Sequence, residues 1–437
     1  MYKKTIFWFR QDLRTFDNIW LYNAVLESEN IIPIFIIDKN IQEKFWKNDK
    51  RFSFIYELLR DLKKELQQKE SDLFVFEDRP EKIIPELIEK YNIDSIFTNT
   101  SYSKYWSQRD QTIKKYCEAN NVAFKSFTDY LILPPDKIEY RKVFTPFYKK
   151  WRPVVDSLDL ELKTIKNIHT DFSCDTSIDI PESKHDYFDL DGAKDSLANF
   201  NFEKYEDKKD FPAEKYGTSK LSPFLRFWKI SPRWLFKRVE NVNETFVKEL
   251  AWREFWHHVR YNFPEFEHLE FQEKRRHISR MNDENDFKKY CEAKTWYPIV
   301  DAALKQLTQT NFMNGRVRMV TASFLTKNLL IDWKKWEEFF SQHLLDYDET
   351  INIWNWQWSA SVGPDPKPLR VFNPILQSQK FDSKAQYIKK YIPELEKFPA
   401  EEIHDPMKYT LEWYYTPIVP QKESWRRARE YYKWEQK

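Results

Sequence analysis

Three short blocks in the C-terminal half combine tryptophan, arginine and acidic side chains, at residues 248–258, 314–333 and 344–365. In the first block, Glu249 and Trp252 are three positions apart and share one face of any helix formed there. The other charged or amide members of the blocks are Arg316, Arg318, Asp346, Asp348 and Asn352. One such block is as typical of an aromatic core with a solvated charged face as of a site. The three together favour a site for a flat aromatic ligand with polar edges.

Motifs of several other enzyme classes do not occur in the sequence. There is no G-x-S-x-G nucleophile elbow, no P-loop, no HExxH motif and no G-x-G-x-x-G fingerprint after the first expected strand. The cysteines Cys117, Cys174 and Cys291 have no CxxC spacing, so we expect neither a disulfide framework nor a metal site. The features that stand out instead are the aromatic and charged blocks of the C-terminal half.

Composition limits the partners and the compartment. The 71 Lys and Arg residues are balanced by 69 Asp and Glu residues, which excludes a histone-like polycation but permits a local basic face. The N-terminus has no apolar run of signal-peptide length, and no apolar stretch is long enough for a membrane span. We therefore expect a cytoplasmic protein without a membrane segment.

The first 130 residues alternate strand-like and helix-like patterns. Short apolar runs predict strands at residues 5–9, 31–37, 73–76 and 95–99. Amphipathic stretches predict helices at residues 52–69, 80–91 and 107–120. This alternation predicts a Rossmann-like α/β domain with a parallel sheet over residues 1–130.

The composition and periodicity of the remaining chain change at two points. Residues 131–202 lack periodicity and are rich in Asp, Ser, Lys and Thr, which is typical of an interdomain linker. Strand signals then disappear, and helices are predicted at residues 244–261, 297–309, 316–330 and 333–345. We expect residues 203–437 to form a larger all-α domain.

Several long segments carry a family resemblance. FWFRQDLRTFDN, TWYPIVDAALKQLTQTNFMNGRVRMVTASFLTKNLLIDW, NWQWSASVGPDPKPLRVFNP and PIVPQKESWRRARE resemble, in this order, segments of the photolyase/cryptochrome family. The resemblance covers essentially the whole chain, and the WQWSAS form is similar to class I cyclobutane pyrimidine dimer photolyases. It implies that the all-α domain binds FAD. It also implies that light drives an electron from reduced FAD to a dimer in DNA, that the ring then splits, and that the electron returns.

The resemblance assigns residues to the FAD site. Those implied for FAD binding, mostly at its phosphates and ribitol, are Tyr205, Thr218, Ser219, Lys220, Leu221, Ser222 and Arg253. A helix beginning at Ser219 would suit phosphate binding, although a helix cap and turn is the alternative. Arg318 and Asp346 are implied to lie by the isoalloxazine, with Asp348 on its polar edge. Asn352 matches the residue that faces flavin N5, where a neutral amide indicates repair.

The resemblance also implies a lesion pocket. The residues implied to hold the flipped-out dimer or its DNA are Glu249, Trp252, Arg316, Met319, Trp358 and Arg370. Extruding a damaged base pair costs only a few kcal/mol, less than an intact one, which contributes to selectivity. Gly315 and Met319 occupy the places where (6-4) enzymes carry histidines, so cyclobutane dimers are favoured. The pair Asn314-Gly315 departs from the usual His-Asn, so one amide near the lesion is missing.

Photoreduction in the family uses a chain of three tryptophans. Trp356 and Trp333 match two of them, but the third place falls on Arg280. Residues 269–290 contain no tryptophan that could replace it. We therefore expect photoreduction of FAD to be slow or to need another outer donor.

The expected partner is DNA that contains pyrimidine dimers, bound by a monomer. The basic residues that could contact DNA phosphates are Arg226, Lys229, Arg233, Lys274, Arg275, Arg276, Arg280, Arg316 and Arg370. A second, antenna chromophore could be a folate, a deazaflavin or absent. The main alternative function is a cryptochrome photoreceptor, which Asn352 and the lesion pocket disfavour. A plain flavoprotein oxidoreductase is a third possibility, but it would not need the pocket.

Glycine is scarce and tryptophan abundant. The chain has 4 Gly and 18 Trp, whereas ordinary glycine usage of about 7% would give roughly 30 glycines. The family pattern has glycine where this sequence has Trp20, Trp228, Trp296, Trp336 and Trp354. We expect these five residues to be glycine in the organism, as a UGA codon translated as tryptophan would explain. Compensated substitution is the alternative.

Overall fold

The computed structural model describes residues 1–45, 49–100, 104–127, 129–183, 200–267, 269–276, 280–364, 371–409 and 417–434. The chain forms two compact units. The first unit comprises Met1–Ile138, Trp151–Lys194 and Leu221–Asn241. The second comprises Glu139–Lys150, Asp195–Lys220 and Val242–Lys437. The units are interleaved in sequence, whereas the sequence predicts consecutive segments at 1–130, 131–202 and 203–437, and those limits remain a prediction.

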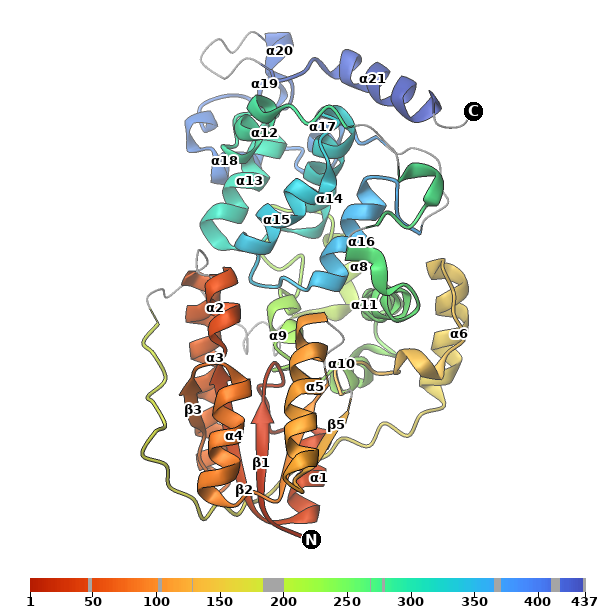
Figure 1. Ribbon diagram of the computed structural model, residues 1–437. Helices are drawn as coiled ribbons and strands as arrows, with labels where there is room; N and C mark the ends of the chain where they lie inside the picture. Colours follow the sequence, from red (N-terminus) through yellow and green to blue (C-terminus); the bar gives the residue numbers. More distant parts are fainter. Residues whose placement is uncertain are drawn as a thin grey trace. The chain divides into compact units, whose positions relative to one another are not determined.

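A five-stranded parallel sheet forms the centre of the first unit (Figure 1). Its strands are β1 (Tyr2–Phe9), β2 (Ser28–Ile37), β3 (Phe74–Glu77), β4 (Ser95–Asn99) and β5 (Ala123–Phe127), in the order β3-β2-β1-β4-β5. The predicted Rossmann-like sheet is confirmed. The sequence prediction missed β5, because this edge strand is only partly buried and its Lys125 and Ser126 interrupt the apolar pattern.

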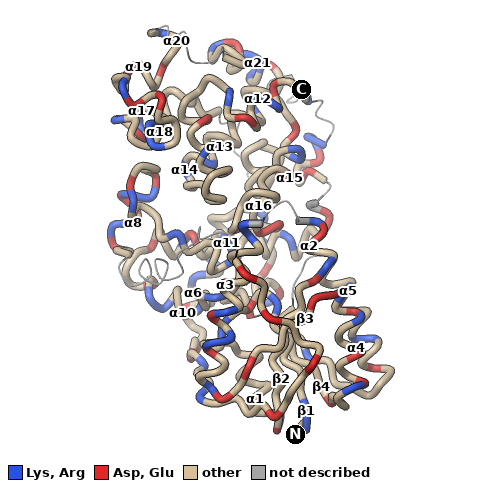
Figure 2. Tube along the Cα trace, turned by 90° about the vertical axis from the view of Figure 1, so that its left-hand side faces the viewer, with Lys and Arg blue, Asp and Glu red and all other residues tan. Residues whose placement is uncertain are grey.

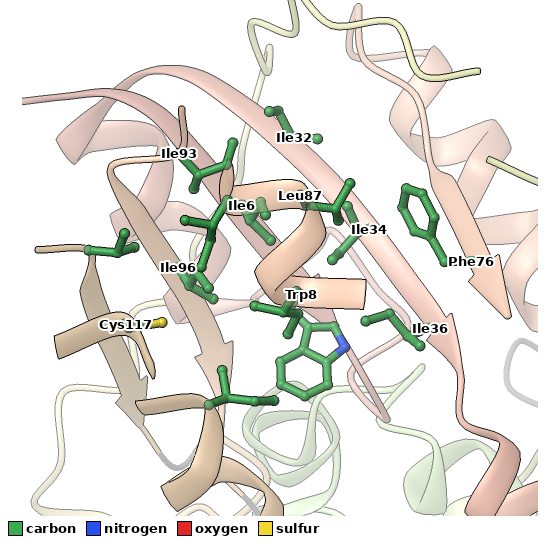
Figure 3. Packing of buried hydrophobic residues seen from close by; sticks show 14 residues of the cluster. Ile6, Trp8, Ile32, Ile34, Ile36, Phe76, Leu87, Ile93, Ile96 and Cys117 are labelled. Carbon is green, nitrogen blue, oxygen red and sulfur yellow. The ribbon is translucent and has the colours of Figure 1, made fainter. Parts of the chain in front are cut away.

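The first unit also contains several helices. They are α1 (Ile19–Glu27), α2 (Lys39–Phe45), α3 (Asp49–Gln67), α4 (Pro80–Tyr91), α5 (Lys104–Ala119), α9 (Ser222–Arg226) and α10 (Pro232–Val239). Alternate residues of β1 and β2, such as Ile6, Trp8 and Ile34, pack with α4 and α5 in one apolar core (Figure 3). On the opposite side of β4, Phe97 meets Trp20 of α1 edge to face at 5.7 Å.

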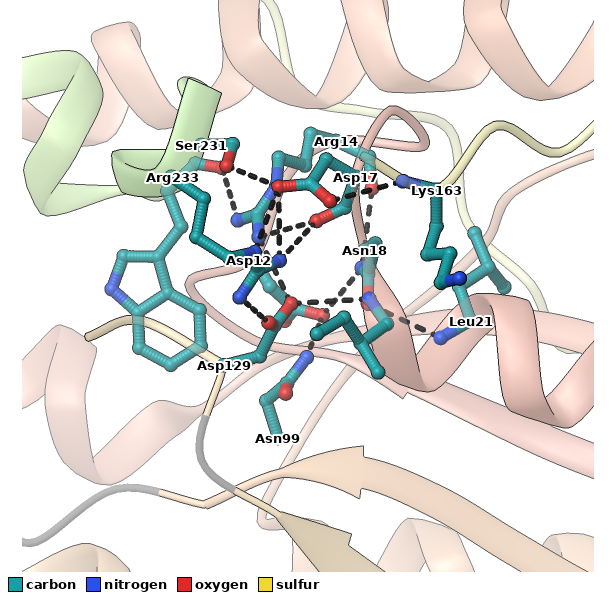
Figure 4. Close-up of polar contacts among 12 residues, drawn as sticks. Asp12, Arg14, Asp17, Asn18, Leu21, Asn99, Asp129, Lys163, Ser231 and Arg233 are labelled. Carbon is teal, nitrogen blue, oxygen red and sulfur yellow. Dashed lines mark hydrogen bonds and ion pairs between the residues drawn. The ribbon is translucent and has the colours of Figure 1, made fainter. Parts of the chain in front are cut away.

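A buried polar network holds α10 onto the loop after β1 (Figure 4). Arg233 Nη1 donates to Asp129 Oδ1 at 2.6 Å, and Arg233 Nη2 lies 2.9 Å from Asp17 Oδ2. Arg14 Nη2 donates to the second Asp129 oxygen at 2.9 Å. All four side chains are at least 93% buried, with exposed fractions of 7% or less. The two acids and two guanidinium groups therefore pair with one another inside the first unit.

We expect Asp129→Ala to lower the free energy of unfolding by about 3–5 kcal/mol, because it leaves Arg14 without its paired carboxylate and leaves Asp17 as the remaining partner of Arg233. Urea unfolding measures this change. The control is Asp136→Ala, whose carboxylate pairs with Lys137 at the surface and which should cost less than about 1 kcal/mol. Equal effects of the two substitutions would contradict a structural role for the network.

The second unit contains helices and no strand among its described residues (Figure 1). Its main helices are α8 (Tyr205–Lys208), α11 (Glu244–Asn262), α12 (Glu284–Cys291), α13 (Pro298–Thr310), α14 (Gly315–Ser323), α15 (Trp333–His343), α16 (Glu349–Ser359), α17 (Pro374–Phe381), α18 (Gln386–Tyr391), α19 (Ala400–His404), α20 (Pro406–Tyr409) and α21 (Gln421–Trp434). A further helix, α6 (Phe144–Asp156), crosses the boundary between the units. The predicted all-α architecture is confirmed, and α16 packs against α11, α14 and α15. None of the described helices combines the length and apolar character that crossing a bilayer requires.

Candidate functional site

Three helices of the second unit carry residues that the sequence singled out, and the side chain of an Asn or Asp caps each helix. Asn243 caps α11 by accepting from the Phe246 N–H at 2.9 Å. Asn314 caps α14 by accepting from the Arg316 N–H at 2.8 Å. Asp348, predicted at the flavin edge, caps α16 by accepting from the Ile351 N–H at 3.1 Å. These caps fix where each helix starts and hence which side chains each helix presents.

One loop connects two of the predicted lesion residues. Lys209 Nζ donates to Glu249 Oε1 on α11 at 2.7 Å. The next residue, Asp210, accepts from Arg316 Nη2 on α14 at 2.6 Å. The Asn314 side chain also donates to the Lys209 carbonyl, at 3.3 Å. The loop after α8 thus contacts α11 through Glu249 and α14 through Arg316, although the sequence predicted no role for Lys209 or Asp210.

Trp252 lies in an aromatic stack. One face of its ring lies on Phe144 of α6, with centroids 3.6 Å apart and planes 5° from parallel. Trp256 contacts it at 5.3 Å in a tilted arrangement. Trp252 remains half-buried, so the part of the ring away from Phe144 is what the protein could offer to a base. Phe144 was missed, because its segment reads as linker in the sequence.

The remaining predicted lesion residues are placed less completely. Met319 on α14 and Trp358 on α16 are half-buried, and their helices pack against each other. Arg370 lies outside the described residues. Met319 and Trp358 therefore belong to neighbouring helices of the same unit as Glu249 and Trp252.

A second polar group lies around the start of α16. Arg318 Nη2 donates to Asp346 Oδ2 and to the Met313 carbonyl, each at 3.2 Å. The Asp346 side chain is only 6% exposed, whereas that of Arg318 is 30% exposed. The pair therefore presents a cation whose counter-charge is fixed in the protein interior.

Asn352 is held by an acid that the sequence prediction missed. Its Nδ2 donates to Glu337 Oε1 of α15 at 3.1 Å, and the same oxygen accepts from the Tyr347 hydroxyl at 2.8 Å. The buried amide is thus oriented with its nitrogen toward Glu337. This leaves the Asn352 oxygen as the group available for another partner.

Two further residues predicted at the FAD site are placed as follows. Asp348 lies 3.8 Å from His257 Nε2, and Arg253 of α11 is half-buried.

The predicted phosphate-binding segment contains a concentration of positive charge. Burial lowers the pKa of Lys220, and the charges of Lys390 and Lys215 lower it further. Ser219 is buried beside it, and Thr218 precedes it in the chain. The three lysines are nevertheless exposed, and their like charges beside the Thr218 and Ser219 hydroxyls would favour an anion.

One detail of this segment corrects the sequence prediction. The helix begins at Ser222, after Leu221, so Ser219 is not a helix cap. The helix has five residues. Leu221, which precedes it, and Ser222, its first residue, are both predicted FAD contacts and belong to the first unit. Tyr205 packs edge to face on Phe246 at 4.9 Å. Burial raises the pKa of its phenol, as do the charges of Glu249 and Asp210, so the hydroxyl stays protonated.

The residues predicted for electron transfer are buried. Trp356 is 3% exposed and Trp333 is 1% exposed, on the packed helices α16 and α15. Arg280, at the third place, donates to the Tyr432 hydroxyl at 3.3 Å. The Met281 N–H next to it donates to the Leu330 carbonyl at 3.0 Å, three residues before Trp333. The position expected for the outermost tryptophan of the electron-transfer chain thus holds a guanidinium group, beside the segment that leads to Trp333.

Two residues must be removed from the predicted DNA-contacting set. Arg233 is buried in the network of Asp17 and Asp129, and Lys229 forms ion pairs with Asp61 and Glu65. Their charges are already neutralised inside the first unit. The other members that the structure describes, Arg226, Lys274, Arg275, Arg276, Arg280 and Arg316, are half-buried or exposed. Figure 2 shows that basic and acidic residues are interspersed along the chain.

A separate polar cluster lies at the carboxyl edge of the parallel sheet. Arg10, just after β1, pairs with Asp110 at 2.8 Å, and Arg109 of α5 pairs with Asp38 at 3.2 Å. Both guanidinium groups lie over the Trp8 ring, at 4.6 and 4.5 Å. Burial lowers the pKa of Arg10 to about 10. Arg10 Nη2 and Arg109 Nε have no hydrogen-bond partner among the described residues, and ligands of such sheets bind at this edge.

Comparison with known proteins identifies the family. The family described as "FAD binding domain of DNA photolyase" matches residues 246–434, and the one described as "DNA photolyase" matches residues 5–166. A deoxyribodipyrimidine photo-lyase of Synechococcus sp. is 34% identical over 89% of this chain and 88% of its own length. The chain belongs to the DNA photolyase family. A photo-lyase of the same name from Escherichia coli is 32% identical over 95% of this chain and 96% of its own.

Solved structures of photolyases share the fold. An archaeal photolyase from Sulfolobus tokodaii, described with two FAD molecules, is similar with a TM-score of 0.88 and 35% identity over 98% of this chain and 99% of its own. A bacterial class III photolyase from Agrobacterium tumefaciens is similar with a TM-score of 0.89 and 31% identity over 100% of this chain and 98% of its own. The family and the fold that the sequence predicted are confirmed. Since these photolyases include a class III enzyme, they do not assign the chain to class I.

Proposed function

We propose that this chain is a deoxyribodipyrimidine photo-lyase that splits cyclobutane pyrimidine dimers in DNA, in the manner of class I enzymes. The names of its full-length relatives support the activity. The single observation that carries the proposal is the loop at Lys209 and Asp210, which joins Glu249 and Arg316. This loop gathers an acid and a cation on helices that also carry Trp252 and Arg318.

The donor set fits FAD. The basic segment at Thr218, Ser219 and Lys220, with Lys215 and Lys390, would bind the phosphates. Arg318 and Asp346 would lie at the isoalloxazine, and Asn352 would offer its oxygen to the ring edge because Glu337 holds its nitrogen. When bound, reduced FAD supplies the electron that light makes available for dimer splitting.

The protein's own residues would bind and orient the lesion. Trp252 and Trp358 provide apolar surfaces for bases that have lost their stacking. Glu249 would accept a hydrogen bond from a pyrimidine edge, with Lys209 keeping its carboxylate in place. Arg316 would direct a charge-assisted bond toward a phosphate or a carbonyl. Because duplex bases cannot reach such a pocket, the dimer must leave the stack first.

The test is a repair assay in light and in darkness, with the purified protein and an oligonucleotide that contains one cyclobutane dimer. We expect light-dependent loss of the dimer, and no repair of a (6-4) lesion in a parallel reaction. Light-dependent flavin chemistry without repair of either lesion would indicate the cryptochrome alternative.

We further propose that the protein acts as a cytoplasmic monomer. We also propose that the polar cluster at Arg10 and Arg109 is the place for a second chromophore.

We expect Arg280→Trp to speed photoreduction of the bound FAD severalfold, because it places an oxidisable ring where a guanidinium now lies. Transient absorption at tryptophan-radical wavelengths measures the change. Arg280→Phe is the matched control, since it removes the same charge but introduces no comparable donor. Equal photoreduction in the two variants would contradict the proposal that the outer donor is missing. Repair by chemically reduced enzyme should be unchanged in both.

A further inference from the structure

Trp228 occupies a helix-end position that normally requires glycine. It follows α9, whose C-cap is Phe227. Its N–H donates to the Leu225 carbonyl at 3.3 Å, and the following Lys229 N–H donates to the Phe224 carbonyl at 2.9 Å. These two bonds define a Schellman motif with Trp228 at C′, the residue that adopts the left-handed conformation. Its φ is 44°.

The surroundings of Trp228 fix its backbone in this strained conformation. Its carbonyl accepts from Arg14 Nη1 at 2.8 Å, within the polar network of the first unit. Its ring is buried and stacked on Tyr130 at 4.9 Å. A backbone so constrained cannot relax to negative φ without breaking these bonds. For a bulky residue, this conformation is an outlier, whereas glycine adopts it without steric cost.

Trp296 is the second case, and it lies in the other unit. Its φ is 73°. Its N–H donates to Asp301 Oδ2 at 3.2 Å, while Thr295 donates to the other oxygen of Asp301 from both its N–H and its hydroxyl. The buried aspartate thus fixes the turn before α13. The indole is 5% exposed, so it is confined as well.

The distribution of residues with positive φ also indicates that Trp228 and Trp296 stand at positions suited to glycine. Among the described residues, thirteen non-glycine positions have positive φ, and none of the described glycines does. A chain with 4 glycines and 18 tryptophans places two of its largest side chains where the smallest belongs. Two independent mutations to tryptophan, in different units, would each have to overcome the same strain.

We infer that Trp228 and Trp296 are glycine in the natural protein. The tryptophans then come from UGA codons translated as tryptophan, although the source organism reads UGA as glycine. The inference does not depend on the proposed activity. It extends to Trp20, Trp336 and Trp354, which are buried and where glycine was expected from the family pattern.

The gene sequence is the first test. We expect UGA at codons 228 and 296, and at codons 20, 336 and 354. The tryptophans assigned to lesion binding and electron transfer, Trp252, Trp333, Trp356 and Trp358, should be encoded by UGG. UGG at codons 228 and 296 would overturn the inference, and UGG at the other three would limit it to these two positions.

A comparison of two recombinant proteins tests the same inference physically. One carries tryptophan at positions 228 and 296, and the other carries glycine at both. We expect the glycine form to melt roughly 5–10 °C higher, since it relieves left-handed strain at two sites. Trp151→Gly is the matched control, because Trp151 is fully buried but lies inside a helix and is not among the positive-φ residues. This control should lower the melting temperature. A similar loss from Trp228→Gly and Trp296→Gly would overturn the inference.

Discussion

Trp252→Ala is expected to weaken binding of dimer-containing DNA by about 5–150-fold, because base–aromatic stacking contributes about 1–3 kcal/mol per base. The ring is pre-positioned for this contact. Its stack on Phe144, with centroids 3.6 Å apart, fixes the plane of the ring before any base arrives. Titration of a fluorescent dimer oligonucleotide measures the loss, and the flavin absorbance should show that FAD is still bound.

The controls for this prediction separate lesion recognition from general binding. Trp425→Ala removes an exposed tryptophan of α21 and should leave dimer affinity unchanged. Affinity for undamaged DNA should be the same in all three proteins. If Trp252→Ala bound the dimer as tightly as the parent protein, Trp252 would not be a lesion contact.

Glu249 is proposed to contact the same lesion by a different interaction. Glu249→Ala should also impair repair, but Lys209→Gln distinguishes two explanations. If Lys209 serves to hold the Glu249 carboxylate, its loss should cause part of the same defect. An inactive Glu249→Ala with a fully active Lys209→Gln would show that the carboxylate acts without its ion pair.

Most of the fold was predictable where periodicity is strong. The run at residues 31–37 is continuously apolar and forms the buried end of β2. The predicted helix at residues 244–261 matches α11, and the structure shows that Asn243 caps its start. The predicted helix at residues 316–330 was partly wrong. Its α-helical part ends at Ser323, and Phe324–Asn328 forms a π-helical turn. Periodicity cannot reveal this, because one extra residue per turn barely changes the apolar pattern.

The site was predictable in its local pairs but not in its long-range ones. Glu249 and Trp252 could be placed together because helix geometry sets their spacing. Arg318 and Asp346 could be paired only through the family resemblance. The contact of Phe144 with Trp252 joins residues more than 100 positions apart. No local rule encodes that contact, which depends on how the chain returns after an irregular segment.

Asp346→Ala is expected to reduce FAD retention by about 10-fold or more in dissociation constant, because a hydrogen bond between charged groups contributes about 1.5–3 kcal/mol. The carboxylate is 6% exposed and accepts from Arg318 through both oxygens, at 3.2 and 3.4 Å. Without it, Arg318 would lose the counter-charge that fixes its guanidinium toward the expected isoalloxazine. Equilibrium dialysis with free FAD measures the dissociation constant.

Asp346→Asn separates the charge of this residue from its shape. The amide keeps the size of the side chain and one acceptor oxygen, so it can still hold Arg318 in part. FAD affinity should therefore fall less than in Asp346→Ala. Circular dichroism of the apoprotein must stay the same in both variants, since Asp346 lies in the connection between α15 and α16 and not within either helix. If both variants retained FAD like the parent protein while folding normally, Asp346 and Arg318 would form a structural ion pair, and the isoalloxazine would have to be bound elsewhere.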